Sequence, residues 1–184
     1  MKSISVLLTM ITVVLFFFPR KNNTTIQFFN ETETIPTQLG DINNDNILDT
    51  AFVTGPKWLN EDDGYGDPAY YNIDVRFSCN LPSIHHKDAV GAVVENIGDI
   101  DKDGFCEIII VPAWWIGCHG VIEVHSLKNN NWKNSGFAER NVCDNESYKQ
   151  YIKKAGKNKI KILDQLWDDN IGKIIDRYKT IEIK

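Results

Sequence analysis

The 184-residue sequence contains none of the short motifs that mark the common enzyme classes. It has no Gly-x-Ser-x-Gly, no His-Glu-x-x-His and no glycine-rich phosphate loop. It has no Cys-x-x-Cys pair, which leaves a cysteine-based zinc site without support. It also has no concentrated basic face of the kind that nucleic-acid-binding domains carry. These absences argue against those function classes and leave a hydrolase using paired carboxylates or a bound metal as the enzyme hypothesis.

The acidity of the chain is local. The length fits one domain with a real core, and the net charge is −5. Removing seven acids in two short segments would change that charge to +2. The seven are Asp41, Asp45, Asp49, Asp99, Asp101, Asp103 and Glu107.

These two segments share a nine-residue pattern, at Asp41–Asp49 and Asp99–Glu107. Oxygen-bearing side chains occupy positions 1, 3, 5 and 9, and position 6 holds Asn46 or Gly104, which suit a left-handed backbone. Ca²⁺ takes six to eight oxygens, and alternate side chains plus the position-7 carbonyl can converge on one ion. We therefore expect two Ca²⁺ sites, with two acidic turns as the alternative. The predicted ligands are Asp41, Asn43, Asp45, Ile47, Asp49, Asp99, Asp101, Asp103, Phe105 and Glu107.

The pattern is not an EF-hand. An EF-hand needs flanking helices and a Glu at position 12, where this chain has Phe52 and Ile110. Strand-like segments follow instead, at Thr50–Val53 and Ile108–Val111. The residues at position 8, Leu48 and Cys106, are expected to point inward and anchor each loop.

Gly-Asp-x-Asx-x-Asp-Gly-x-x-Asp/Glu followed by an apolar strand resembles the FG-GAP/VCBS repeat, the calcium-loop unit of integrin-α-type β-propellers. The resemblance covers Thr37–Ser126, and the two copies lie 58 residues apart, close to one blade. It implies a binding or structural module. A closed propeller needs about four or more blades, and only two loops are present. The expected fold is therefore mainly β, with antiparallel blade-like sheets joined by calcium loops, incomplete and propeller-like.

The N-terminus indicates export. Met1-Lys2-Ser3 leads into the apolar segment Ile4–Phe18, which is shorter than the roughly 20 residues of a membrane-spanning helix. We predict a signal peptide or N-terminal anchor over 1–20, a flexible leader over 21–36 and one β-rich domain over 37–184. The protein is then secreted, or periplasmic or cell-envelope, with membrane contact only through an uncleaved N-terminal segment.

An even number of cysteines is compatible with two disulfides in an oxidising compartment. Cys79, Cys106, Cys118 and Cys143 allow three pairings, and the sequence does not choose among them. Cys106 is equally compatible with a buried thiol.

Further elements follow from local patterns. Tyr70–Cys79 alternates as a half-buried strand, and Val121–His125 pairs in a hairpin with the strand after the second loop. Tyr148–Ala155 predicts a short C-terminal helix, followed by a terminal hairpin around Trp167–Gly172.

The function expected from these features is recognition of a protein or glycan by an exported module with structural calcium. Exposed aromatic residues are the candidate contacts, namely Trp58, Trp114 and Trp115. His85-His86 is a poor metal pair, because adjacent residues of a strand point to opposite sides. A small inhibitor or immunity-type envelope protein is the alternative, and the hydrolase comes third.

Overall fold

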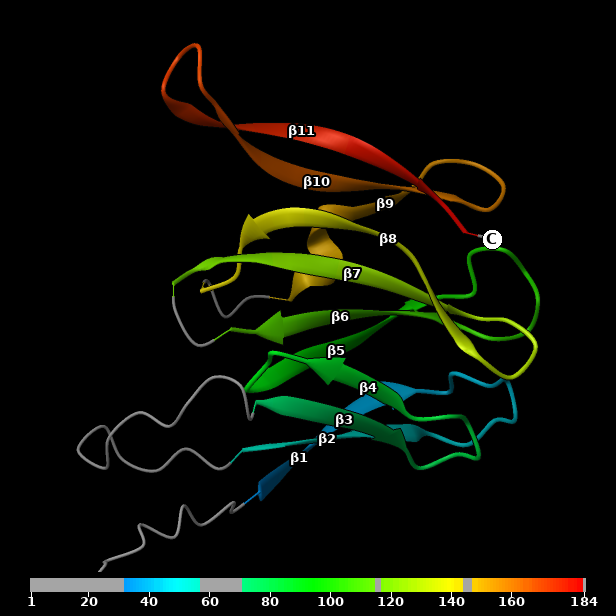
Figure 1. Cartoon of the computed structure of the whole chain (residues 1–184). Coiled ribbons are helices and arrows are strands. Elements are labelled where there is room, and N and C mark those ends of the chain that lie inside the picture. Colours follow the sequence, from blue (N-terminus) through cyan, green and yellow to red (C-terminus); the bar gives the residue numbers. More distant parts are fainter. Residues whose placement is uncertain (1–31, 57–70, 115–116, 144–146, 184) are drawn as a thin grey trace, which may run out of the picture.

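Three antiparallel sheets stack on one another (Figure 1), in a computed structural model that describes residues 32–56, 71–114, 117–143 and 147–183. The first sheet has the order β1-β2-β3-β4, and the middle sheet has the order β5-β6-β7-β8. The terminal sheet is β11-β10-β9. Within the described residues the sheets are open and do not close into a ring, so a propeller is not shown.

The strands of the first sheet are β1 (Thr32–Gly40), β2 (Asp49–Pro56), β3 (Asn72–Phe77) and β4 (Ile84–Lys87). Those of the middle sheet are β5 (Gly91–Gly98), β6 (Glu107–Ala113), β7 (His119–Leu127) and β8 (Trp132–Asn141). The terminal sheet contains β9 (Ile152–Lys154), β10 (Lys159–Asp168) and β11 (Lys173–Glu182).

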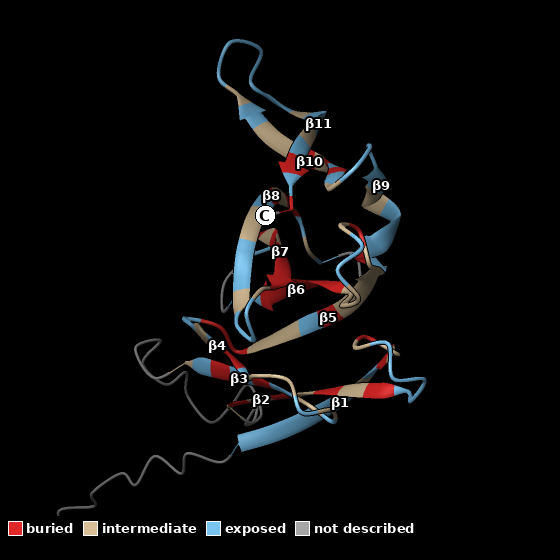
Figure 2. Ribbon diagram, turned by 90° about the vertical axis from the view of Figure 1, so that its right-hand side faces the viewer, coloured by how far each residue is buried: buried red, intermediate tan, exposed pale blue. Residues whose placement is uncertain are grey.

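Strand β6 of the middle sheet is buried on both faces (Figure 2), which explains why Ile108–Val111 is continuously apolar. Ile108 and Ile110 belong to the core shared with the first sheet, and Ile109 and Val111 to the core shared with the terminal sheet. The first core also contains Leu39, Ile42, Ala51, Val53, Ile73, Val75, Ile84, Ala89 and Val94. The second also contains Ile100, Ile122, Val124, Ala138, Tyr148, Ile160, Ile162, Ile181 and Ile183.

Side chains of β10 cover the edge of the middle sheet. The backbone N–H of Glu139 donates to Asp164 Oδ1 (2.8 Å), and that of Asn141 donates to Gln165 Oε1 (2.8 Å). These bonds satisfy donors of edge strand β8 that have no further backbone partner strand.

One disulfide joins Cys118, just before β7, to Cys143, just after β8. Cys79 and Cys106 are free thiols, so the second disulfide that the sequence allowed is not formed. Burial raises the pKa of Cys79 to about 11, assisted by the neighbouring Asp49, and burial also raises the pKa of Cys106. Both therefore remain thiols rather than reactive thiolates at neutral pH.

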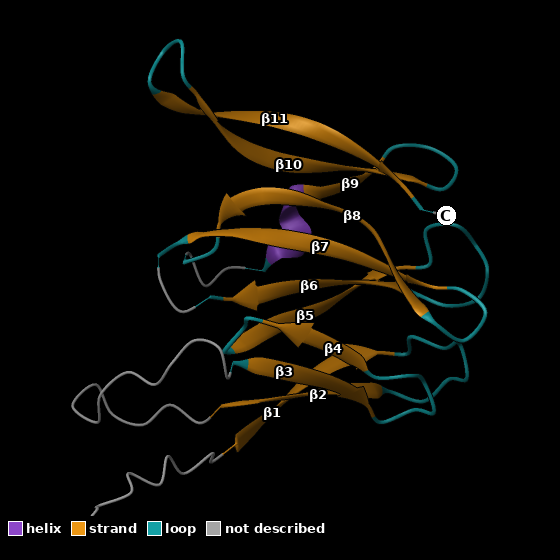
Figure 3. Ribbon diagram, viewed as in Figure 1, coloured by secondary structure: helices purple, strands orange, loops and turns teal. Residues whose placement is uncertain are grey.

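The predicted C-terminal helix is wrong. Tyr148–Tyr151 forms a single 3-10 turn, the only helical element that Figure 3 displays among the described residues. Ser147 provides no side-chain cap, and Ile152 already belongs to β9, which pairs with β10. The pairing of β9 with β10 thus ends the helical segment after the single turn at Tyr148–Tyr151.

The predicted antiparallel β architecture is confirmed, including the terminal hairpin of β10 and β11. The segment predicted as a signal peptide or anchor, 1–20, lies outside the described residues. β1 begins at Thr32, so the end of the 21–36 range forms a strand. None of the described helices is long and apolar enough to cross a membrane.

Candidate functional site

The two acidic loops occupy the same place in their sheets. The first joins β1 to β2, and the second joins β5 to β6. In each, the strand register shifts just before the loop, between Gln38 and Gly40 and between Asn96 and Gly98. Gly40 (φ 75°) and Gly98 (φ 86°) both take the positive φ that turns the chain out of the sheet.

In the first loop the backbone winds around its own carboxylates. Asp41 accepts hydrogen bonds from the backbone N–H groups of Asp45 (3.2 Å) and Asn46 (2.8 Å). Asp45 in turn accepts one from the N–H of Ile47 (2.8 Å).

The second loop repeats these bonds position by position. Asp99 accepts from the N–H groups of Asp103 (3.2 Å) and Gly104 (3.1 Å), and Asp103 accepts from Phe105 (3.0 Å). Positions 4 and 6 are left-handed in both loops, at Asn44 (φ 61°), Asn46 (φ 67°), Lys102 (φ 65°) and Gly104 (φ 96°). The two loops therefore share one conformation, in which the carboxylates at positions 1 and 5 accept hydrogen bonds from the backbone of their own loop.

The acids at position 9 are anchored below the loops. Asp49 and Glu107 are each only 1% exposed. Asp49 accepts from the N–H of Ile42 (3.0 Å), and Glu107 accepts from the N–H of Ile100 (2.7 Å). Burial raises the pKa of Glu107, while the hydrogen bonds from Ile100 and from Ser126 oppose that rise. Hydrogen bonds to both oxygens fix the orientation of each buried carboxylate.

Three carboxylates of the second loop converge. Asp99, Asp101 and Glu107 each offer an oxygen, and these oxygens lie within 4.8 Å of one another. The first loop has Asn43 at the position of Asp101, so it offers an amide oxygen and one less negative charge.

A lysine ammonium meets the carboxylates of the second loop. Lys128 Nζ donates to Asp101 Oδ2 and to Asp103 Oδ2, the latter at 2.6 Å. Burial alone would lower the pKa of Lys128, but these two hydrogen bonds outweigh it and raise the pKa above its ordinary value. The positively charged ammonium of Lys128 thus contacts two carboxylates that the sequence predicts as metal ligands.

The first loop has no such lysine at the corresponding place. Ser126 donates to Glu107 (3.0 Å), as Ser78 donates to Asp49 (3.4 Å), so these two serines correspond. Two residues further along each chain, Lys128 in the second unit corresponds to Asn80 in the first.

The two loops touch each other. The N–H of Cys106 donates to the carbonyl of Ile42 (2.8 Å), and its thiol contacts the carbonyl of Asp41 (3.6 Å). The side chain of Asn96 donates to the carbonyl of Leu39 (2.9 Å). Ordering one loop therefore constrains the other through direct hydrogen bonds.

One anchoring prediction is wrong. Leu48 at position 8 is 73% exposed, and Ile42 at position 2 is buried in its place. In the second loop, Ile100 at position 2 is buried and Cys106 packs against the first core as expected. Position 2 anchors both loops, since its side chain is buried and its N–H donates to the buried carboxylate at position 9.

The aromatic candidates are described only in part. Trp114, after β6, is 38% exposed, whereas Trp58 and Trp115 lie outside the described residues. Trp167 on β10 is 62% exposed and was not singled out from the sequence, because it adjoins the turn of the predicted terminal hairpin.

A histidine–glutamate cluster was also missed. Glu123 accepts from His125 (2.9 Å) and from His86 across the sheet boundary (3.3 Å). Glu123 and His125 share one face of β7 by alternation, which was visible in the sequence, but the approach of β4 was not. His85 points elsewhere, to Asp74 (2.9 Å), as expected for adjacent residues of a strand.

Comparison of the chain with protein-family models, with curated proteins and with solved structures gives no match.

Proposed function

We propose that this protein is an exported calcium-binding β-module of the FG-GAP/VCBS type, in which the metal is structural and the module serves recognition of a protein or glycan. The observation that carries the proposal is the pair of loops with one hydrogen-bond pattern, together with the convergence of Asp99, Asp101 and Glu107 in the second loop. In the second loop the ammonium of Lys128 contacts two of the predicted ligands, so a bound metal ion would have to displace it.

Calcium suits this donor set. Each loop offers side-chain oxygens from positions 1, 3, 5 and 9 and a backbone carbonyl at position 7, and hard cations prefer oxygen ligands. A bound ion would offset the mutual repulsion of the carboxylates. Binding to the native state alone would stabilise it by about 2.7 kcal/mol per site at a concentration 100 times Kd.

The position of the loops supports a structural role rather than a catalytic one. Each loop joins the first two strands of its sheet, and each is fixed by buried acids below it. The cavity that borders the second loop is lined, within the described residues, by lysines, Ile100, Gly156 and Asn158, and by no histidine or carboxylate. This lining gives no support to the hydrolase hypothesis.

The recognition part of the proposal rests on exposed aromatic residues at strand ends. Trp114 follows β6 and remains partly exposed, and aromatic side chains contribute strongly to binding surfaces. This step is an analogy with the function of similar modules.

Calorimetric titration with Ca²⁺ tests the metal sites. We expect two Ca²⁺ per chain for the wild type, and one for Asp41→Ala and for Asp99→Ala separately. Asp169→Ala, an exposed acid outside both loops, is the control and should still bind two. Equal stoichiometry in all four proteins, or no calcium heat at all, would refute the assignment.

A further inference from the structure

A cavity of about 450 Å³ lies between the second acidic loop and the turn that joins β9 to β10. Its volume falls within the range of about 300–1,000 Å³ that is usual for small-molecule sites. The lining residues are Ile100, Lys102, Lys154, Gly156, Lys157 and Asn158.

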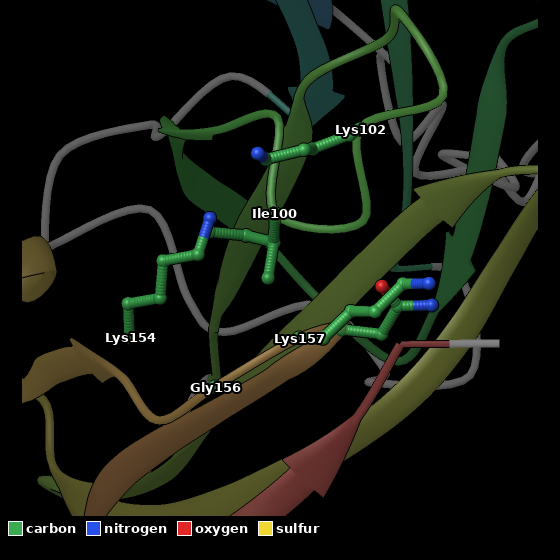
Figure 4. Close-up of a pocket in the computed structure, with 6 residues that line it drawn as sticks. Ile100, Lys102, Lys154, Gly156 and Lys157 are labelled. Carbon is green, nitrogen blue, oxygen red and sulfur yellow. The ribbon is translucent and has the colours of Figure 1, made fainter.

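Three lysines from two separate segments line this cavity. Lys102 belongs to the acidic loop, Lys154 ends β9, and Lys157 lies in the turn. In Figure 4, Lys102 and Lys154 extend to the same side of Ile100, while Lys157 extends along the other side of the pocket. None of the three forms an ion pair with a residue that the structure describes.

The acids of the same loop are engaged away from these lysines. Asp101 and Asp103 contact Lys128, and Asp99 accepts from backbone N–H groups of its own loop. Among the described residues, no acid supplies a countercharge to the ammonium groups of the cavity.

Part of the cavity is formed by the C-terminal segment of the chain, which is positively charged. Residues 147–184 hold ten of the chain's 20 Lys and Arg residues and five of its 25 Asp and Glu residues, a net charge of +5. The remaining residues carry −10. A local positive field of this kind attracts anions from solution.

We propose that this cavity binds the phosphate or sulfate group of a small ligand. Lysine ammonium groups donate charge-assisted hydrogen bonds to oxyanions without requiring a fixed bidentate geometry. Lys102 and Lys154 hold the oxyanion beside Ile100. The remaining volume, toward Lys157, accommodates the group that carries it.

Amide chemical-shift titration of the full chain in EDTA tests this site independently of calcium. The probes are inorganic phosphate, inorganic sulfate and a hexose 6-phosphate. We expect saturable shifts at Lys102, Gly156 and Asn158, with affinity at least tenfold weaker in the double variant Lys102→Gln/Lys154→Gln. The double variant Lys161→Gln/Lys173→Gln is the matched control, because both lysines are exposed and neither lines the cavity.

Tighter binding of the hexose phosphate than of the free ions would support the site and show that its ligand is a phosphate ester. Equal affinities would support the site and assign it to the free ion. Shifts that do not saturate, or an equal loss in the control variant, would overturn the proposal. Amide spectra of the variants that match the wild-type spectrum outside the substituted residues show that the variants are folded. A loss of binding then reports on the cavity. Failure here leaves the calcium proposal standing, because no calcium is present.

Discussion

At the scale of single residues, Lys128 is the most informative side chain. Its ammonium bonds the carboxylates of Asp101 and Asp103, so a metal ion entering the second loop competes with it. The first loop has Asn80 at the corresponding position and carries no such competitor. The two loops should consequently differ in calcium affinity.

Lys128→Met removes the competing cation. We expect calcium to bind the second loop about tenfold more tightly, equivalent to about 1.4 kcal/mol, while the first loop is unchanged. The metal-free variant should melt at a lower temperature, since the carboxylates lose their countercharge. Calorimetric titration and melting in EDTA measure the two effects. An unchanged second site would show that Lys128 does not occupy the metal position.

The serine under each loop gives a second prediction. Ser126 is fully buried and donates to the buried Glu107, whereas Ser78 is exposed and its bond to Asp49 is long. Ser126→Ala should destabilise the protein by about 1–3 kcal/mol, because a buried carboxylate loses a donor. Ser78→Ala should lower the free energy of unfolding clearly less than Ser126→Ala does. Urea unfolding of both variants decides this, and equal costs would contradict the burial argument.

The candidate ligands were predictable from the sequence because they follow one local spacing within nine residues. Lys128 was not, since it lies outside that segment and reaches the loop only through the pairing of β6 with β7. The exposure of Leu48 was not predicted, because the residue that anchors the first loop is Ile42, whose N–H donates to Asp49. That contact does not follow from the spacing of the loop.

At the scale of elements, strand content was predictable from alternation and β-branched residues. One element was not. Trp132–Asn141 lacks a clear apolar period yet forms β8, because it pairs along the whole of β7. Trp132 also donates to the carbonyl of Pro82 (2.8 Å) and contacts Phe77, which ties β8 to the first sheet. Long-range pairing of this kind overrides local propensity.

The disulfide belongs to this scale, because it ties the start of β7 to the segment after β8. The N–H of Val142 also donates to the carbonyl of Cys118 (2.7 Å). Cys118→Ser/Cys143→Ser should lower the free energy of unfolding by about 2–4 kcal/mol. Cys79→Ser, which removes a free thiol and leaves the disulfide intact, is the control. A reducing agent should lower the free energy of unfolding of the wild type but not that of the double variant. Insensitivity of the wild type to reduction would mean that the bridge contributes nothing.

At the scale of the whole molecule, the contact of His86 with Glu123 links the first sheet to the middle sheet. Burial alone would raise the pKa of Glu123, but hydrogen bonds from His125 and His86 lower it to about 2. The hydrogen bond that His86 donates to Glu123 raises the pKa of His86 above 6.5, against the opposing effect of burial.

These shifts set a pH window for stability. The Glu123 contribution is present above its unfolded pKa of 4.5 and is lost as the pH falls toward 2. The His86 contribution is present below 6.5 and is lost as the pH rises through its raised pKa. We expect Glu123→Gln to lose most stability between pH 4.5 and 6.5, measured by urea unfolding across pH. Glu182→Gln, exposed on β11, is the control, and an equal loss at all pH values would contradict the ion-pair account.

The stacking of three sheets could not be derived from the sequence, because the pattern of Ile108–Val111 predicts a strand but not which sheets cover it. The two-loop pattern indicated blade-like units, and the sheets that contain them are equivalent in order. The third sheet carries no loop pattern, so only its hairpin was predictable.

The most direct test of the calcium account is thermal unfolding of residues 21–184 in calcium, in magnesium and in EDTA. The Asp41→Ala/Asp99→Ala double variant is measured beside Asp169→Ala/Glu182→Ala, which removes the same charge outside the loops. The account predicts a calcium-specific rise in Tm for the wild type and the control, and none for the loop variant. If calcium changes the Tm of none of them, or raises all three equally, the loops are acidic turns and not metal sites.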